Sequence, residues 1–242
     1  MGKIDLHSIA GPGVLIAVVC LWCYYRKTES HRRKESRHRI TLYTYPNYRS
    51  MRCIWLATEL GIDNNIKMIE MDPHDKRKCE SYKTAVHPHC TIPALVLEDG
   101  NTIIESGAIC LYMADFHKSL VPETQWIADY YNWIVYACST LDDMMETIYL
   151  QWYLTDSEDQ NEQLVKRMTD KFQVFADYFN NYLKGKSFIC GDKFTAADCI
   201  MGYNIWWASG MREGCLIDQY PEIISYLSRL QSRYAFQNTF PS

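Results

Sequence analysis

The sequence lacks the closely spaced cysteine pairs that are typical of small secreted domains. Its ten cysteines are scattered over 242 residues, and a chain of this length buries a sizeable core without cross-links. A reducing compartment is therefore the simpler interpretation of the thiols. The one C-x-x-C, formed by Cys20 and Cys23, lies inside an apolar run. There we expect small apolar helix residues or palmitoylation sites rather than a redox motif.

Positive charge is in deficit outside the first 39 residues. Residues 1–39 hold eight Lys or Arg against three Asp or Glu, whereas residues 40–242 hold 17 against 26. An acidic body of this kind argues against nucleic acid as a partner. We also predict no metal site in the chain.

Charge of either sign is missing from Ile9 to Tyr25, a run of 17 residues. This length is at the short end of what a membrane-spanning helix needs. Aromatic residues close the run, as at a membrane interface, and seven Lys or Arg follow it in residues 26–39. A cleaved signal peptide would carry its positive charge before the apolar run and end in an A-x-A-like site, which is not evident here.

The pattern therefore predicts one N-terminal transmembrane helix over residues 9–25, preceded by a short tail, 1–8, and followed by a basic linker, 26–39. The positive-inside rule places the linker and the body in the cytosol, with the linker on anionic lipid headgroups. We expect a single-pass membrane protein. The length of the run suits either the endoplasmic reticulum or the mitochondrial outer membrane.

Residues 40–118 show the element order of a thioredoxin-like α/β domain. Strands are predicted over 40–44, 66–71, 94–97 and 102–105, and helices over 50–60, 76–83 and 106–116. Ser106 is a candidate N-cap of the last of these helices. The bond between Ile92 and Pro93 is either cis, which would turn the Ile92 backbone toward a ligand, or trans at a loop end.

Few strand signals follow, and residues 123–242 are predicted to form an all-α helical domain. Helices are predicted over about 123–152, 160–184, 195–207 and 221–234. Thr195 and Asp198 form a capping box, and Pro221 suits the first position of the final helix. The aromatic stripe of the first helix predicts core packing rather than a cofactor site.

Four stretches together resemble the glutathione transferase superfamily over residues 40–240. LYTYPNYRSMRCIWLATELG is similar to the first strand and helix of its bacterial, serine-type members, and HPHCTIPALVLEDGNTIIESGAICLYMAD to its glutathione-site stretch. GDKFTAADCIMGYNIWWA and YPEIISYLSRLQSRYAF are similar to two helices of its second domain. The order and spacing of all four make the resemblance specific. The N-terminal anchor departs from the usual pattern.

The resemblance implies glutathione as co-substrate and names a binding site. The backbone of Ile92, beside Pro93, would pair with the cysteinyl part of glutathione. Glu105 and Ser106 would hold the γ-glutamyl amine and carboxylate. A serine at a helix N-terminus suits a carboxylate on physical grounds as well, and it can serve as a plain N-cap at the same time.

The thiol needs a hydroxyl donor near the start of the first helix, because that bond favours the thiolate. Serine-type members carry the donor two residues after the proline of the first turn, where this chain has Tyr48. Ser50 is the second candidate, and Arg49 and Arg52 add positive potential. Tyrosine-type members place the donor on the first strand, where this chain has Tyr43, which could point either way. Alternatively, Tyr48 is a rim aromatic without a role.

The loop before the Thr-Ile-Pro turn adds two candidates to the glutathione site. Cys90 aligns with a histidine of insect-type members, and His89 beside it would contact the glycyl carboxylate. A mixed disulfide between Cys90 and glutathione is a further option. No cysteine stands at the start of the first helix, where a glutaredoxin-like mechanism would need one.

Two functions fit these residues. One is a membrane-anchored glutathione transferase that conjugates or reduces hydrophobic electrophiles, in a detoxification role, as a homodimer or in a larger membrane complex. The other is a catalytically inactive docking module or subunit of a membrane-associated complex. The stretch TYPNYRS also resembles the N-terminal module of the gamma subunit of translation elongation factor 1, and the usual serine is replaced.

Deleting residues 1–39 should convert a membrane-bound protein into a soluble, folded one, because the deletion removes both the apolar run and the basic linker. Fractionation of cells that express the full or the shortened chain measures this. Protease added outside sealed organelles should digest the body of the full chain. Recovery of the full chain in the soluble fraction would contradict the anchor, and complete protection would reverse the topology.

Overall fold

The computed structural model describes residues 40–240 of the chain. The predicted tail (1–8), transmembrane anchor (9–25) and basic linker (26–39) lie outside the described residues. Over 40–240, no helix is both long and apolar enough to cross a membrane. From Ile40 onward the chain forms one compact unit.

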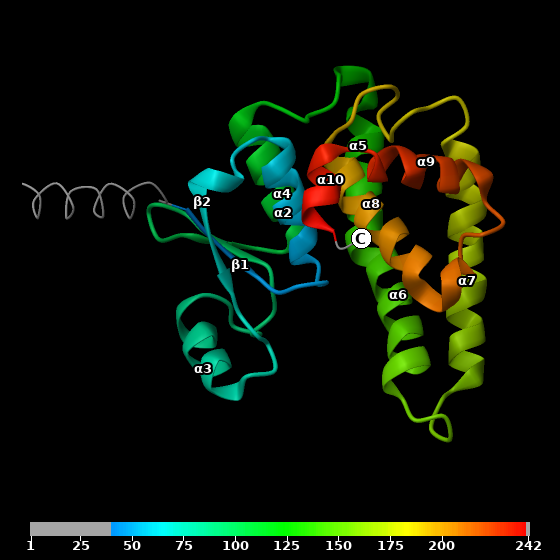
Figure 1. The fold of residues 1–242 in the computed structure, drawn as a ribbon, viewed down its shortest axis with the longest axis horizontal. Helices are drawn as coiled ribbons and strands as arrows, with labels where there is room; N and C mark the ends of the chain where they lie inside the picture. The colour runs from blue at the N-terminus through cyan, green and yellow to red at the C-terminus, as the bar shows by residue number, and fades with distance from the viewer. Residues whose placement is uncertain (1–39, 241–242) are drawn as a thin grey trace, which may run out of the picture. The chain divides into compact units, whose positions relative to one another are not determined.

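A four-stranded sheet opens this unit, in the order β2-β1-β3-β4 (Figure 1). Its strands are β1 (Ile40–Thr44), β2 (Ile66–Glu70), β3 (Ala94–Val96) and β4 (Thr102–Ile104). β1 runs parallel to β2 and antiparallel to β3, which pairs with β4 as a hairpin. Leu42 and Leu95 face each other in the ladder and are buried. The predicted thioredoxin-like arrangement is confirmed.

Three helices accompany the sheet. They are α2 (Ser50–Glu59), α3 (Lys76–Ala85) and α4 (Ser106–His117), and a 3₁₀ turn, η1 (Asp63–Asn65), follows α2. α2 and α4 pack on each other and against the helical half, whereas α3 lies apart from them at the foot of the sheet (Figure 1). Gly61 ends the α2 turn with φ +68°, a left-handed conformation that glycine adopts without strain.

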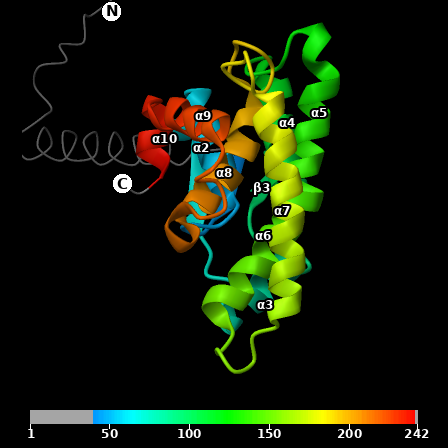
Figure 2. The same ribbon diagram turned by 90° about the vertical axis from the view of Figure 1, so that its right-hand side faces the viewer.

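The second half is all helical, as predicted (Figure 2). Its elements are η2 (Thr124–Trp126), α5 (Ile127–Tyr136), η3 (Ala137–Leu141), α6 (Asp142–Tyr149), η4 (Leu150–Leu154), α7 (Glu162–Tyr182), α8 (Ala196–Gly210), η5 (Met211–Gly214), α9 (Pro221–Gln231) and α10 (Tyr234–Thr239). η3 and η4 are π-helical turns. η3 lies inside the stretch predicted as one long helix, and η4 extends past its predicted end at about residue 152. Turns of this kind are frequent at functional sites.

The helix predicted over 221–234 ends earlier, because α9 stops at Gln231. A separate helix, α10, begins at Tyr234. Between them Arg233 is extended, with φ −76° and ψ 137°. Its guanidinium is bonded to both carboxylate oxygens of Glu59 on α2, at 2.6 and 2.7 Å. This tertiary ion pair holds the chain extended between α9 and α10. The spacing of the apolar residues in the segment does not predict the interruption.

Trp55 of α2 joins the two halves. Its side chain is fully buried, with ring centroids 5.1 Å from Phe236 and 5.5 Å from Phe240. Gly202 of α8 faces the ring, and a Cβ at this position would stand 3.0 Å from it. The absence of a side chain therefore lets α8 approach α2 closely. The segments predicted as separate domains, 40–118 and 123–242, share one core.

The predicted capping box at the start of α8 is confirmed. Asp198 is fully buried, and it accepts bonds from Thr195 N at 2.8 Å, Ile189 N at 2.9 Å and the Tyr226 hydroxyl at 3.0 Å. Burial raises the pKa of Asp198 to about 6, against the lowering effect of these donors. Because folding favours the protonated acid, its contribution to stability is complete below about pH 4 and declines as the pH rises through about 6.

Asp198→Ala should destabilise the protein more than Thr195→Ala. Loss of the carboxylate leaves two backbone N–H groups and the Tyr226 hydroxyl unpaired in the core, at about 3 kcal/mol or more, whereas loss of the cap hydroxyl costs about 1 kcal/mol. Denaturant unfolding measures both values. As the pH rises from about 4 to about 6, the free energy of unfolding of the wild type should fall because of Asp198. Asp198→Ala should lack this fall. Equal losses for the two variants would limit Asp198 to capping.

Candidate functional site

The turn ahead of α2 carries Tyr48, the first predicted thiol-activating residue. Its side chain is 38% exposed, and its hydroxyl lies 2.9 Å from Nε2 of His74. The ring also meets Tyr45 edge to face, with centroids 5.2 Å apart. Partial burial, helped by Tyr45 and Tyr149, raises the pKa of the Tyr48 phenol. The hydroxyl is therefore protonated at neutral pH and can donate a hydrogen bond.

Ser50, the second predicted donor, lies inside the protein. It is fully buried; its hydroxyl donates to the Tyr45 carbonyl at 2.9 Å and accepts from the Tyr45 N–H at 3.1 Å. Both bonds close the turn from β1 into α2. A hydroxyl engaged in this way does not face a ligand, so the geometry argues against Ser50 as the thiol activator and assigns it a structural role.

Arg52 anchors the centre of the site. Its guanidinium is fully buried and forms a two-pronged pair with Asp142, at 2.9 Å from Nη1 and 2.7 Å from Nη2. Nη1 also donates to the Ser106 hydroxyl at 3.1 Å, and Nη2 donates to the side-chain carbonyl of Asn204. The amide of Asn204 in turn donates to Asp142 at 2.9 Å. One cluster therefore joins α2, α4, α6 and α8.

The charges of this cluster stabilise one another. Burial by itself would lower the pKa of Arg52, but Asp142 outweighs it, and the net shift is upward. Burial would likewise raise the pKa of Asp142, yet the two arginines hold it below its usual value. Arg49 is the outer partner, with Nε 2.9 Å from Asp142 and Nη2 2.8 Å from Glu146. Arg49 thus points to α6 rather than into open solvent.

The predicted glutathione-binding residues meet at one corner of the sheet. The Ile92–Pro93 bond is cis, and Ile92 lies ahead of β3, outside its ladder. Ala94 pairs with Ile104, so this turn lies beside Glu105 and Ser106 at the start of α4. Ser106 is 5% exposed, and Glu105 is exposed with φ +72°. A positive φ at a non-glycine residue is a strained conformation that is common at functional sites.

The loop before the turn differs from its prediction in one respect. His89 is exposed, and its N–H donates to Nδ1 of His87 at 3.2 Å. Cys90 is 6% exposed and forms a disulfide with Cys79 of α3. The expectation of free thiols is therefore wrong for this pair. The two cysteines are eleven positions apart in the sequence, and only the packing of α3 against the loop brings them together.

The helical half adds an aromatic wall beside Tyr48. Tyr149 lies 5.1 Å from Tyr153 and 5.7 Å from Trp207, measured between ring centroids. Tyr203 of α8 donates its hydroxyl to the Asn47 carbonyl at 3.1 Å and so joins this wall to the turn ahead of α2. Trp207 and Tyr149 are half-buried, which leaves part of each ring open to a ligand.

Sequence reasoning missed several residues of this site, and four of them lie against predicted residues. His74, Asp142 and Asn204 touch predicted residues directly, and Tyr149 adds a ring close to Tyr48. Asp142 gave no clear signal, because Asp143 stands beside it and Asp129 and Glu146 lie in the same helical stretch. His74 stands in a polar loop and had none.

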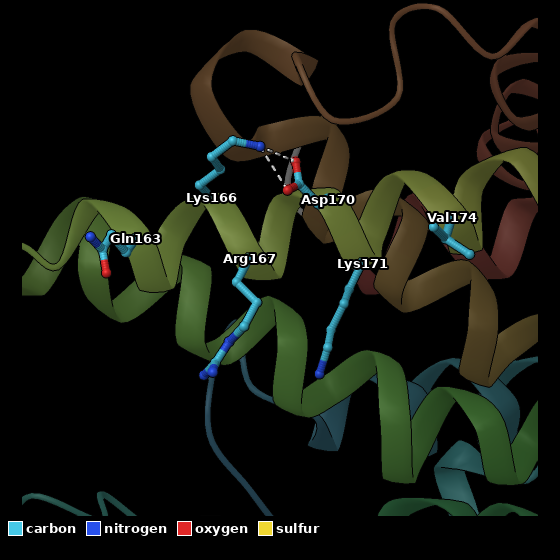
Figure 3. A pocket seen from close by; sticks show the side chains of 6 residues that line it. All are labelled: Gln163, Lys166, Arg167, Asp170, Lys171 and Val174. Atoms are coloured by element: carbon cyan, nitrogen blue, oxygen red, sulfur yellow. Dashed lines mark hydrogen bonds and ion pairs between the residues drawn. The ribbon is translucent and has the colours of Figure 1, made fainter.

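A hollow on the exposed face of α7 is separate from this site (Figure 3). Its lining is Gln163, Lys166, Arg167, Asp170, Lys171 and Val174. Lys166 Nζ lies 2.7 Å from Asp170 Oδ2, an exposed i,i+4 pair worth a few tenths, roughly 0.3–0.5, of a kcal/mol. All six residues come from one helix and none is a predicted site residue, so this hollow is a solvated charged face.

Both halves of the chain match known families. The N-terminal domain of glutathione S-transferase matches residues 49–115, and the C-terminal domain matches residues 141–233. Glutathione S-transferase GstA of Escherichia coli O157:H7 is 26% identical over 158 residues, covering 64% of this chain and 74% of that protein. Human elongation factor 1-gamma is 24% identical over 176 residues, covering 69% of this chain and 38% of that protein.

A solved structure gives the same fold. Ure2p in complex with S-hexylglutathione superposes with a TM-score of 0.72 at 20% sequence identity. The match covers 83% of this chain and 97% of that chain. Likeness at this level of identity establishes the arrangement of both halves.

Asp142→Ala should be among the most destabilising substitutions in the chain. It leaves the Arg52 guanidinium buried without its counter-charge, at a cost of about 3–5 kcal/mol. Arg49→Ala removes only the outer partner and should cost about 1 kcal/mol or less. Denaturant unfolding compares them, with exposed Asp143→Ala as the matched control.

The pair between Arg52 and Asp142 also makes the stability of the protein depend on pH. Because the pKa of Asp142 is lowered in the folded protein, its contribution is present above its unfolded value near 4 and is lost as the pH falls through the folded value. Asp142→Ala should lack this acid-side loss. A cost for Asp142→Ala no larger than that of Asp143→Ala would show that the pair does not hold the site.

Proposed function

Because the chain belongs to the glutathione S-transferase superfamily, we propose that it binds glutathione and uses its thiol to conjugate or reduce hydrophobic electrophiles. The observation that carries this proposal is the corner where the Ile92–Pro93 turn meets Ser106, with Arg52 bonded to the serine. This corner supplies the kinds of group that a charged tripeptide needs.

The corner suits each polar part of glutathione. The main chain of Ile92 is available to the peptide groups of the cysteinyl residue. The N-terminal N–H groups of α4 suit the γ-glutamyl carboxylate, because a helix N-terminus carries partial positive charge. The Ser106 oxygen accepts from Arg52, so its O–H remains free to donate to that carboxylate. The exposed Glu105 suits the γ-glutamyl ammonium, and His89 would meet the glycyl end.

Tyr48 is the proposed activator of the thiol. Its raised pKa keeps the hydroxyl protonated, and a phenol that donates to sulfur favours the thiolate. With the proton of His74 on Nε2, the imidazole donates to the phenol oxygen and leaves the phenol O–H for the sulfur. His74 would thus aim Tyr48, while Ser50 fixes the turn on which Tyr48 stands.

The aromatic wall suits a hydrophobic electrophile. The rings of Tyr149, Tyr153 and Trp207 cluster on the helical side of Tyr48, and aromatic faces bind flat apolar groups well. An electrophile on this wall would lie within reach of a thiolate held by Tyr48. The protein would then contribute to the reaction by orienting the two reactants and by stabilising the thiolate.

The apolar run 9–25 and the basic linker 26–39 support a membrane location for this chemistry. In this proposal the body faces the cytosol at the endoplasmic reticulum or the mitochondrial outer membrane, where hydrophobic electrophiles partition. Tyr131 and Val135 of α5 are exposed apolar side chains, which supports a homodimer or a larger membrane complex.

A docking module is the second candidate. The likeness to elongation factor 1-gamma favours it, as does Tyr48, which replaces the serine of serine-type members. In that case the corner would be a structural remnant, and the surface of the helical half would carry the function.

Two substitutions in the full-length protein test the proposed enzyme. Ser106→Ala should weaken calorimetric binding of S-hexylglutathione roughly tenfold or more, since it removes a donor to a charged group. Tyr48→Phe should leave this affinity nearly unchanged, because the probe has no thiol. It should lower conjugation of glutathione to an aryl halide by about one to three factors of ten.

The matched controls are Ser228→Ala and Tyr234→Phe, which make the same changes at exposed side chains of α9 and α10. If the wild type binds no S-hexylglutathione and turns over no electrophile, the enzyme proposal fails and the docking module stands. Binding without any effect of Tyr48→Phe on turnover would remove Tyr48 from the reaction.

A further inference from the structure

Cys79 and Cys90 form the only disulfide among residues 40–240, where the other six cysteines are free. Their Cα atoms are 5.7 Å apart. Cys79 is half-buried on α3, whereas Cys90 is 6% exposed in the loop. Cys53 and Cys110 offer a comparison within the same chain. Their sulfurs are 4.0 Å apart, but both side chains are fully buried.

The disulfide is one of few links that hold α3 on the protein. Tyr82 is the only buried residue of this helix, whose other side chains are mostly charged or polar. Its hydroxyl donates to the Thr91 carbonyl at 3.0 Å, and its ring meets Tyr43 at 5.0 Å between centroids. Tyr82 and the disulfide therefore tie α3 to the same loop, and α3 lies apart from the other helices (Figure 1).

Both ends of this link reach the candidate site. Cys90 stands two residues before Ile92, whose main chain is the proposed partner of glutathione. His74 stands in the segment that leads into α3, and its Nε2 is 2.9 Å from the Tyr48 hydroxyl. His74 lies two residues before the start of α3, so displacement of α3 would displace His74 as well. The loop tied to α3 leads directly into the Ile92–Pro93 turn.

We propose that Cys79 and Cys90 are a redox-active pair that exchanges with glutathione, and that the disulfide form holds α3 and His74 against the candidate site. The second half of this statement rests on the proposed function. If the body faces the cytosol, as proposed above, a disulfide there fits an exchanging pair better than a permanent cross-link, because glutathione keeps most cytosolic thiols reduced.

The exchange proceeds through the more accessible sulfur. A glutathione thiolate attacks Cys79 Sγ, forms a mixed disulfide there, and releases the Cys90 thiolate, which takes a proton from water. A second glutathione thiolate attacks the sulfur of the bound glutathione, forms glutathione disulfide, and releases Cys79, which is protonated likewise. One protein disulfide is reduced and two glutathione molecules are oxidised. The reverse sequence restores the bond.

The first test is peptide mapping of the full-length protein by mass spectrometry, after equilibration in buffers with different ratios of reduced to oxidised glutathione. The wild type should shift reversibly between the Cys79–Cys90 disulfide and two thiols. Cys90→Ser should trap one glutathionyl group on Cys79. Cys53 and Cys110 should carry none. The exchange would be overturned if Cys79 and Cys90 kept the same redox state in every buffer. It would also be overturned if the glutathionyl group in Cys90→Ser were found on a cysteine other than Cys79.

The second test is calorimetric titration with S-hexylglutathione, whose blocked thiol cannot exchange. Wild type that has been reduced with dithiothreitol, in buffer free of glutathione, should bind this probe roughly three- to tenfold more weakly than oxidised wild type, because a loosened α3 no longer preorganises the site. The double variant Cys79→Ser/Cys90→Ser should match the reduced wild type, with or without dithiothreitol.

The outcomes separate this inference from the proposed function. Equal affinity in the two redox states of the wild type would overturn the coupling and leave the glutathione site in place. Absence of binding in both states would overturn the site and the coupling together, while the mapping experiment would still decide the exchange.

Discussion

The buried pair between Arg52 and Asp142 is the interaction on which the rest of the structure depends. A guanidinium with no solvent contact must be paired and hydrogen-bonded, because an unpaired charge in the core is very costly. Asp142, Asn204 and Ser106 meet this need from three other helices. The partners that the Arg52 guanidinium needs therefore determine how the α/β half packs against the helical half. They also hold the Ser106 hydroxyl in place.

The candidate site follows from that arrangement, because neither half completes it alone. The α/β half contributes the Ile92–Pro93 turn, Ser106 at the start of α4, and Tyr48 ahead of α2. The helical half contributes the acid that neutralises Arg52 and the aromatic wall around Tyr149. Glutathione chemistry needs both a polar cradle and an apolar neighbour, and the packing of the halves places the two side by side.

The least firmly held part of the site is the segment around α3. Most of the fold is secured by a continuous core, whereas α3 is held through Tyr82 and the disulfide to one loop. Elements with few buried contacts open most readily. The contact between His74 and Tyr48 therefore links the turn ahead of α2, a helix packed into the core, to the segment that leads into α3.

The sequence by itself determined the element order, the helix starts at Ser106 and Thr195, and the candidate glutathione residues. The elements and helix starts depend on local patterns of a few residues, which the chain carries whatever its tertiary packing. The glutathione residues came from the resemblance of four longer stretches to a known family. Tertiary structure alone decided that Ser50 is buried while Tyr48 faces outward, that Asp142 pairs with Arg52, and that Cys79 meets Cys90. Each of those outcomes joins residues far apart in the chain, or depends on which side of a helix is covered, and local periodicity does not encode such distances.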